Sequence, residues 1–405
     1  MEELKNYSKY LGNEWNYLKK VLEGENWSAT SGSWAHELES AFAKMIGCKY
    51  GIACNSGTSA LHMALEAVGV TAGDEVISPA ITVIMDTTAT LHANAIPVYC
   101  DVNPETYNLD PDDLERKITE KTKAIITVAL YGSAPDYDRI IEIAHKHNIP
   151  VIEDNAEAVL SYYHGKVLGT IGDIACFSFE NSKHISCGEG GMVLTDHEEY
   201  AKRARKLGGH GFKNLGADEG RVRMFNKEMF QNPKYKRHDA LGWNYRMPEF
   251  NAAVALAQVE RAEELVELRK KTAEIFISVM NDCNYLIPQK NLPNTINSYF
   301  AVGIKYEGED QIGIPWTAFR KKYVEMGGDG FYGAWSVPYL EPVIADRTFV
   351  HRLPSLYHNV FYKKGICPIA EAIQPKIMQF KANYRNLELA KQKADVLHKV
   401  IQLYH

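Results

Sequence analysis

The sequence predicts an α/β protein whose mainly parallel sheet is covered by helices on both faces. Four segments rich in valine and isoleucine have the length of buried strands, namely 73–80, 95–102, 123–132 and 149–156. Amphipathic segments at 59–69 and 135–148 lie between them and place apolar residues along one helical face. Apolar strands that alternate with helices are typical of a parallel sheet that is buried on both sides.

The remaining segments complete the large domain and predict a second, smaller one. Two further short apolar runs predict two more strands of the large domain, 175–179 and 190–196. Segment 206–243 loses the alternation and gathers glycine, asparagine and basic residues, which indicates a long loop. Segment 247–280 predicts one long connecting helix, and an α+β arrangement follows it at 298–306, 316–327 and 383–404. We therefore predict a large domain over 1–255 and a small domain over 256–405.

Composition and charge favour an ordinary cytoplasmic protein. The 405 residues are 45% apolar, and the net charge of −6 gives no general attraction to nucleic acid or to an anionic membrane. The first 20 residues lack the apolar core of a signal peptide, and no apolar run approaches the roughly 18 residues that span a bilayer. Seven separated cysteines without a C-x-x-C pair make disulfides and structural zinc unexpected, and we expect no metal.

The segment "CNSGTSALHMAL" can bind a phosphate. Its small residues Ser56, Gly57, Thr58 and Ser59 lead directly into a predicted helix, where backbone N–H groups and hydroxyls meet the positive end of the helix dipole. A simple helix cap by Ser56 or Thr58 is the alternative interpretation of the same residues.

Asp154 and Lys183 are the two candidate reactive residues. Asp154 ends a predicted core strand, where open α/β sheets bind ligands, and a half-buried carboxylate there needs a cation such as a protonated pyridine nitrogen. A helix cap or an ordinary salt bridge would also explain it. Lys183 lies in the connection between the last two predicted strands and can form a Schiff base if it is held in a cleft. Otherwise it is a solvated loop lysine.

The order of the motifs decides between these alternatives. The chain shows S-G-T, then E-D-x-x-E, then S-F-x-x-x-K-x-x-x-x-G-E-G-G, then N-Y-R-M, together with "GDEVISP" and "CPIAEAI". From about Trp27 to Glu371 it resembles the DegT/DnrJ/EryC1/StrS family of sugar aminotransferases. The resemblance implies the fold of type I pyridoxal-phosphate enzymes, pyridoxal 5'-phosphate as cofactor, and a homodimer with shared active sites.

The resemblance also implies a role for individual residues. Lys183 matches the lysine that binds the cofactor covalently, and Asp154 matches the acid paired with the pyridinium nitrogen. Glu157 matches a position near the cofactor's phenolic oxygen. Gly57, Thr58 and Ser178 match residues that bind the cofactor's phosphate. Asn244 matches an asparagine that reaches the phosphate in the other subunit.

Two segments depart from the family pattern. Val83 stands where an aromatic residue usually stacks on the cofactor ring, which predicts a smaller apolar contact. The segment "EMGGDGFYGAWSVPYLEP" also departs, in a region where substrate is selected. His184 is one position late for the histidine of the sugar 3-dehydratase branch, so we interpret it as a packing or hydrogen-bonding neighbour of Lys183.

The implied function is transfer of an amino group, from L-glutamate, to a nucleotide-linked 4-keto-6-deoxy hexose in amino-sugar synthesis for a surface polysaccharide or a glycosylated metabolite. The alternatives are a sugar 3-dehydratase and a non-catalytic regulatory protein with the same fold. The basic residues of the predicted loop can bind a substrate diphosphate or can simply be solvated. They are Lys206, Lys213, Arg221, Arg223, Lys227, Lys234, Lys236 and Arg237.

Overall fold

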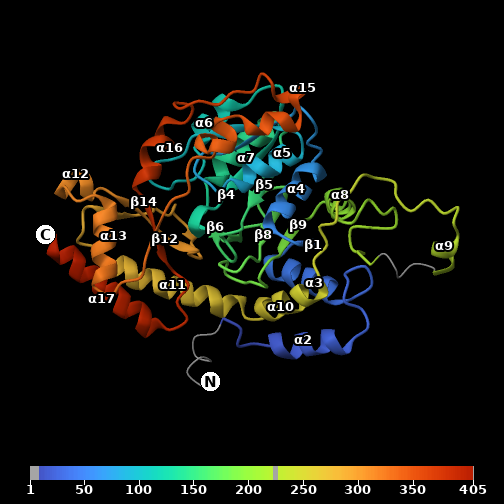
Figure 1. The fold of residues 1–405 in the computed structure, drawn as a ribbon, viewed down its shortest axis with the longest axis horizontal. Helices are drawn as coiled ribbons and strands as arrows, with labels where there is room; N and C mark the ends of the chain where they lie inside the picture. The colour runs from blue at the N-terminus through green and yellow to red at the C-terminus, as the bar shows by residue number, and fades with distance from the viewer. Residues whose placement is uncertain (1–8, 222–226, 405) are drawn as a thin grey trace.

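The computed structural model describes residues 9–221 and 227–404, and a seven-stranded sheet lies at its centre (Figure 1). The strand order is β1-β9-β8-β5-β4-β2-β3, in which β3, β2, β4, β5 and β8 are parallel, whereas β9 runs antiparallel to both of its neighbours, β8 and β1. Their bounds are β1 Tyr50–Cys54, β2 Glu75–Pro79, β3 Ile96–Cys100, β4 Thr122–Val128, β5 Val151–Asp154, β8 Ile174–Ser178 and β9 Gly191–Thr195. The predicted α/β fold with a mainly parallel sheet is confirmed.

Helices cover both faces of this sheet because alternate side chains of each strand point to opposite sides. Ile126 and Ile152 face one core, which contains α4 (Gly57–Ala67), α5 (Met85–His92) and α8 (Glu198–Gly208). The neighbouring residues of the same strands, Ile125 and Val151, face the other side, where α6 and α7 pack. The helices of that side are α3 (Trp34–Ile46), α6 (Pro111–Lys117), α7 (Tyr137–His147) and α10 (Glu249–Val259), and α2 (Glu14–Glu23) packs on α10.

The prediction of one helix over 247–280 is wrong, because the segment forms two helices. After α10 ends at Val259, α11 begins at Ala262 and runs to Ser278. The turn at Glu260 and Arg261 contains neither proline nor glycine, and the Arg261 guanidinium holds Glu264 at 2.8 and 3.0 Å. The break lets α10 pack into the core beside β8 and β9, which the first two turns of α11 also join, while the later part of α11 packs into a separate core.

A four-stranded antiparallel sheet, in the order β10-β12-β14-β13, builds the second core with α11, α13 and α17 (Figure 1). The bounds are β10 Leu286–Pro288, β12 Ala301–Tyr306, β13 Tyr332–Gly333, β14 Ile377–Lys381, α13 Trp316–Glu325 and α17 Leu387–Leu403. Shorter elements are β6 Tyr162–Tyr163, β7 Lys166–Val167, β11 Thr295–Ile296, α12 Gly308–Ile312, α14 Pro342–Ala345, α15 Pro354–Tyr357 and α16 Pro368–Ile373.

The segment that carries α14, α15 and α16 returns to the large sheet. The Tyr357 hydroxyl donates to the Ala95 carbonyl at 3.1 Å, and the Cys367 thiol contacts the Tyr99 carbonyl at 3.5 Å. The domain boundary at residue 255 stays a prediction. No helix in the described part of the chain is long and apolar enough to cross a membrane.

The first three residues of the predicted loop 206–243 form the end of α8, and the rest extends away from the body of the protein, with the short helix α9 (Lys227–Gln231) in its described part (Figure 1). Two of its cations are already paired within the loop. Lys206 contacts Asp239 at 2.7 Å, and Arg221 contacts Glu219 at 3.0 Å. Arg223 lies outside the described residues, and a role of the loop in substrate binding stays a prediction.

Candidate active site

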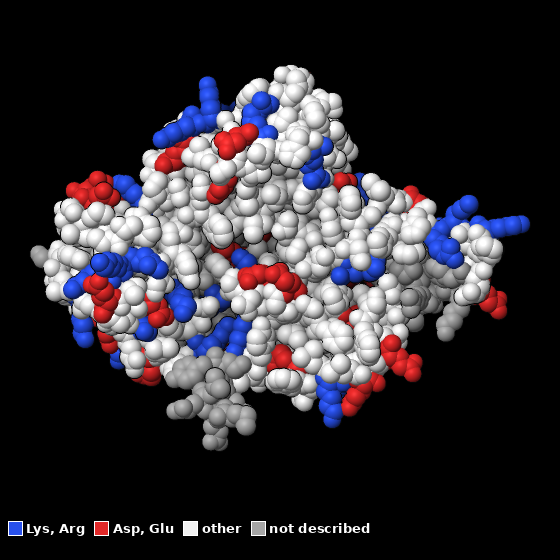
Figure 2. Space-filling model, viewed as in Figure 1, with Lys and Arg blue, Asp and Glu red and all other residues white. Residues whose placement is uncertain are grey.

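A cavity of about 830 Å³ lies between the carboxyl ends of β5 and β8 and the edge strand β13. All the predicted site residues except Asn244 line it, although they come from four separate segments of the chain. These are Gly57, Thr58, Val83, Asp154, Glu157, Ser178 and Lys183. The face shown in Figure 2 is hollowed near its centre, and acidic side chains lie near the hollow.

The first turn of α4 forms one end of the cavity. Ser56 caps this helix, since its hydroxyl accepts the Ser59 N–H at 3.1 Å, so the simple capping interpretation holds for that residue. The amides of Gly57 and Thr58 belong to the first turn, where helices leave N–H groups without an intrahelical partner. A Cβ on Gly57 would approach the Ser178 Cβ to 2.9 Å, so only glycine lets this turn reach Ser178. The arrangement suits a phosphate group.

Asp154 ends β5 beneath this turn and is 4% exposed. Its Oδ1 accepts the Ala156 N–H at 2.9 Å. Burial raises the pKa of the Asp154 carboxyl from 3.8 to about 6, although the Ala156 amide and the charge of Lys183 favour the ionised form. The adjacent carboxylate, Glu153, points to the opposite face of β5 and accepts the N–H groups of Gly169, Ile171 and Gly172 at 2.7 to 2.8 Å. Alternation along the strand therefore separates a cavity carboxylate from a structural one.

Lys183 lies in the connection between β8 and β9, as predicted, and its side chain enters the cavity. Its Nζ donates to Glu157 Oε1 at 3.3 Å and lies 4.4 Å from the centre of the Phe300 ring. Glu157 is itself fixed by the Tyr131 N–H at 3.0 Å. An acid and an aromatic face thus fix the direction of the amine inside the cavity.

The loop that carries Lys183 is held from behind by Arg269 of α11, whose side chain is fully buried. The guanidinium donates to the Ser182 carbonyl at 2.7 Å and to the Lys183 carbonyl at 3.1 Å. His184 is also fully buried, and its Nε2 donates to the Ser298 carbonyl at 3.1 Å. Burial lowers the pKa of His184, so its imidazole is neutral and matches the predicted hydrogen-bonding neighbour.

Several cavity residues were not identified from the sequence. Phe300 precedes β12, and Tyr332 and Trp335 come from the β13 segment, with side chains that are 68% and 59% exposed. The signal for the last two was the departure of "GFYGAWS" from the family pattern. Val83 and Met85 both line the cavity. Two aliphatic side chains therefore lie where the family usually has one aromatic residue.

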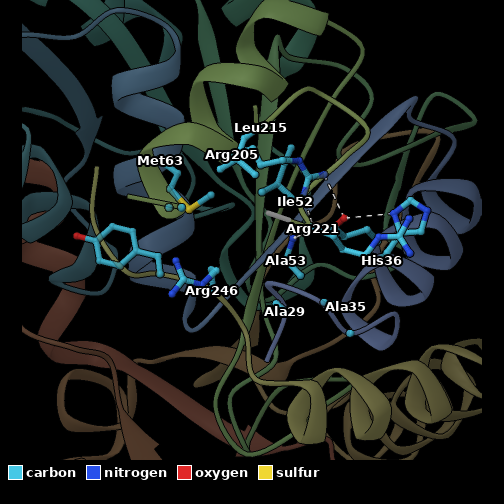
Figure 3. Close-up of a pocket in the computed structure, with 16 residues that line it drawn as sticks. Ala29, Ala35, His36, Ile52, Ala53, Met63, Arg205, Leu215, Arg221 and Arg246 are labelled. Atoms are coloured by element: carbon cyan, nitrogen blue, oxygen red, sulfur yellow. Dashed lines mark hydrogen bonds and ion pairs between the residues drawn. The ribbon is translucent and has the colours of Figure 1, made fainter. Parts of the chain in front are cut away.

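Asn244 lies apart from the cavity of its own chain. It is exposed and forms an isolated antiparallel bridge with Gly209. A smaller pocket near this segment, of about 40 Å³, is lined by Arg205, Arg221 and Arg246 and by His36 (Figure 3). It has room for water-sized occupants only. Its buried Arg205 is neutralised by Glu39 at 2.8 Å.

The residues of the large cavity fit pyridoxal 5'-phosphate. Gly57 has no side chain, so the first turn of α4 comes close to Ser178, and the space beside them can hold a phosphate. Burial raises the pKa of Asp154, and a cationic ring nitrogen beside it would supply the opposite charge that the buried carboxylate lacks. The Lys183 amine stands in the same cavity.

Comparisons with known proteins agree with a site for pyridoxal phosphate. Residues 11–332 match the model of the DegT/DnrJ/EryC1/StrS aminotransferase family. The GDP-perosamine synthase of Caulobacter vibrioides is 42% identical over 64% of this chain and 65% of its own length. The GDP-perosamine synthase of Escherichia coli O157:H7 is 36% identical over 72% of this chain and 75% of its own length.

Solved structures share the whole fold. An aminotransferase from Psychrobacter cryohalolentis superposes with a TM-score of 0.87 at 25% identity, over 98% of this chain and 100% of that one. A putative sugar aminotransferase from Streptococcus pneumoniae, solved in a PMP form, gives 0.81 at 22% identity over 97% of both chains, which shows the fold.

Proposed function

Because this chain belongs to the DegT/DnrJ/EryC1/StrS aminotransferase family, we propose that it transfers an amino group from L-glutamate to a nucleotide-linked keto sugar, namely a 4-keto-6-deoxy hexose. Its cofactor is pyridoxal 5'-phosphate. The names of the two GDP-perosamine synthases support a nucleotide sugar as the acceptor. We further propose that two copies of the chain form a dimer in which Asn244 serves the partner's site.

One observation carries this proposal: Lys183, Asp154, Ser178 and the first turn of α4 meet in a single cavity. A non-catalytic relative would have no reason to keep a lysine amine aimed by Glu157 into the same space as a buried carboxylate. The dehydratase branch has a histidine in place of the lysine. Here Lys183 holds that position and His184 is bonded to the Ser298 carbonyl, which favours transamination.

The residues divide the chemistry among them. Bound pyridoxal phosphate supplies an electron sink at the substrate carbon. Asp154 holds a proton on the ring nitrogen by charge pairing, and Ser178 with the α4 turn anchors the phosphate. Lys183 Nζ is the base that takes a proton from the substrate carbon, while Glu157 orients this amine at 3.3 Å. Phe300 covers the amine and limits its contact with water.

The product distinguishes the proposed transamination from dehydration. With L-glutamate and a panel of keto-sugar nucleotides, we expect the accepted sugar to exchange its carbonyl oxygen for an amino group and to keep all its hydroxyls. Mass spectrometry of the product measures this directly. Loss of a hydroxyl without gain of nitrogen would establish the dehydratase alternative, and no reaction with any donor would favour the regulatory one.

Trp335→Ala is expected to raise KM for the sugar nucleotide roughly tenfold with little change in kcat. An aromatic side chain that is 59% exposed at the cavity entrance can stack on a nucleobase, and such stacking contributes about 1 to 3 kcal/mol. Steady-state kinetics measure the effect. Phe361→Ala is the control, since Phe361 is equally exposed at 64% but does not line this cavity. Equal effects of both variants would contradict stacking at Trp335.

Asp154→Asn is expected to weaken cofactor binding by about 100-fold or more, because it leaves the ring nitrogen without its counter-charge. In the wild type, cofactor affinity should fall as the pH drops below about 6, where Asp154 takes up a proton. The variant should lose this pH dependence. Fluorescence or absorbance titrations over pH 5–8 measure both effects.

The same variant should stabilise the cofactor-free protein. An acid whose pKa is raised on folding binds its proton more tightly in the folded state, so stability falls as the pH rises from about 4 to 6. Removing this charge should recover about 1 to 3 kcal/mol at pH 7, as measured by denaturant unfolding. A less stable Asp154→Asn protein would contradict the burial argument.

A further inference from the structure

A second buried carboxyl group, Asp86, lies behind the cavity. It occupies the first turn of α5, directly after Val83 and Met85, which line the cavity, and its side chain is fully buried. Its Oδ2 accepts the Thr82 hydroxyl at 2.6 Å. Its Oδ1 is buried and has no hydrogen-bond donor among the described residues.

The carboxyl groups of Asp86 and Asp154 are close enough to interact by charge and by a side-chain hydrogen bond. Two buried carboxylates in contact cannot both be ionised, because each charge repels the other and neither is solvated. Because Oδ2 accepts the Thr82 hydroxyl, we assign the shared proton to Asp86 Oδ1, from which it can be donated to Asp154. The orphaned oxygen is therefore explained by a neutral acid at Asp86.

The other groups that face the pair place the charge on Asp154. Lys183 and the Ala156 N–H favour an ionised Asp154, and Glu157 opposes it. The Thr82 hydroxyl favours an ionised Asp86, but burial and Asp154 raise its pKa well above the usual range of a carboxyl group. The nearby Cys176 thiol stays protonated, because burial raises its pKa.

We infer that Asp86 is a positioning residue that carries a proton and donates it in a hydrogen bond to Asp154, so that Asp154 alone holds the negative charge facing the cavity. The donated hydrogen bond fixes the rotation of the Asp154 carboxylate and makes it a weaker base. A weaker base leaves the proton on the cofactor's ring nitrogen, where the chemistry requires it. This last consequence rests on the proposed function, while the protonated pair does not.

Infrared spectroscopy of the cofactor-free protein tests the pair. Labelling the aspartate carboxyl carbons with carbon-13 identifies aspartic acid bands separately from those of glutamic acid. We expect one protonated aspartate band that persists to pH 8, well above the pKa of about 6 at Asp154. The band should vanish in Asp86→Asn and remain in Asp113→Asn. Asp113 is a matched control, since it is a first-turn helix aspartate whose carboxylate accepts the Asp101 N–H at 2.7 Å.

Cofactor binding tests the consequence for Asp154. Asparagine at position 86 keeps a donor toward Asp154 and an acceptor toward Thr82, so Asp86→Asn should change the dissociation constant less than about threefold. Asp86→Ala removes the donor and should raise it roughly tenfold or more. Equal effects of the two variants would overturn the inference.

The absence of a persistent aspartate band in the wild type would also overturn it, even if neither variant folds. That result would leave the proposed function intact, because the spectrum is recorded without cofactor. Failure of the wild type to bind cofactor would instead overturn the proposed function and leave the protonated pair standing.

Discussion

Lys183→Ala is expected to abolish turnover, with a loss of at least roughly 1,000-fold, because the same amine holds the cofactor and moves the proton. The fold should persist, since the loop around Lys183 is held through its backbone carbonyls by Arg269 rather than through the lysine side chain. Glu157 also keeps its bond to the Tyr131 N–H. Kinetic assays and thermal unfolding of the variant measure both statements.

Borohydride reduction of the loaded wild-type protein should fix the cofactor on Lys183, and peptide mapping by mass spectrometry identifies the labelled residue. Lys202→Ala is the control, because Lys202 lies on the surface of α8 and pairs only loosely with Glu199 at 3.7 Å. It should retain full labelling and activity. A labelled peptide from another lysine would refute the assignment of Lys183.

Mixing inactive Asn244→Asp subunits with inactive Lys183→Ala subunits is expected to restore activity. In its own chain Asn244 lies outside the cavity that holds Lys183, so a contribution to an active site requires a second copy. If Asn244 reaches the partner's phosphate, a heterodimer carries both lesions in one site and none in the other. Asp at position 244 would repel the phosphate.

Activity should approach one quarter of the wild-type value after complete exchange, since half the dimers are mixed and each has one intact site. Differently tagged subunits, separated after mixing, confirm exchange and allow the mixed species to be assayed alone. If purified heterodimers remain inactive, Asn244 does not act across the proposed interface. Mixing Lys183→Ala with Asp154→Asn is the control, because both residues line the same cavity of one chain.

Local sequence patterns were enough for most of the cavity and for every strand of the large sheet except β1, Tyr50–Cys54, which was not predicted. The predicted strands ending near Pro79 and Asp154 form as expected, and Lys183 lies in the predicted connection. Parallel strands bring their carboxyl ends to one edge of a sheet, so residues that follow different strands meet there without further information. The ordered motifs then related these positions to a known family.

Other features depend on contacts that have no local signature. The break at Glu260 and Arg261 contains no helix-breaking residue, and beyond it α11 leaves the core that it shares with α10 and packs Ala273 and Phe276 into the second core. Phe300 reaches Lys183, and Arg269 holds the lysine loop, only because the second core docks against the first.

The sequence by itself determined the α/β fold, the family and the residues expected to bind the cofactor, because these are written in short segments with regular spacing. Only the tertiary structure decided what surrounds those residues. It placed Trp335 at the cavity entrance and Asp86 against Asp154, although 68 positions separate the two aspartates in the chain. Burial and proximity set the proton affinity of such a pair, and both arise from packing between distant segments.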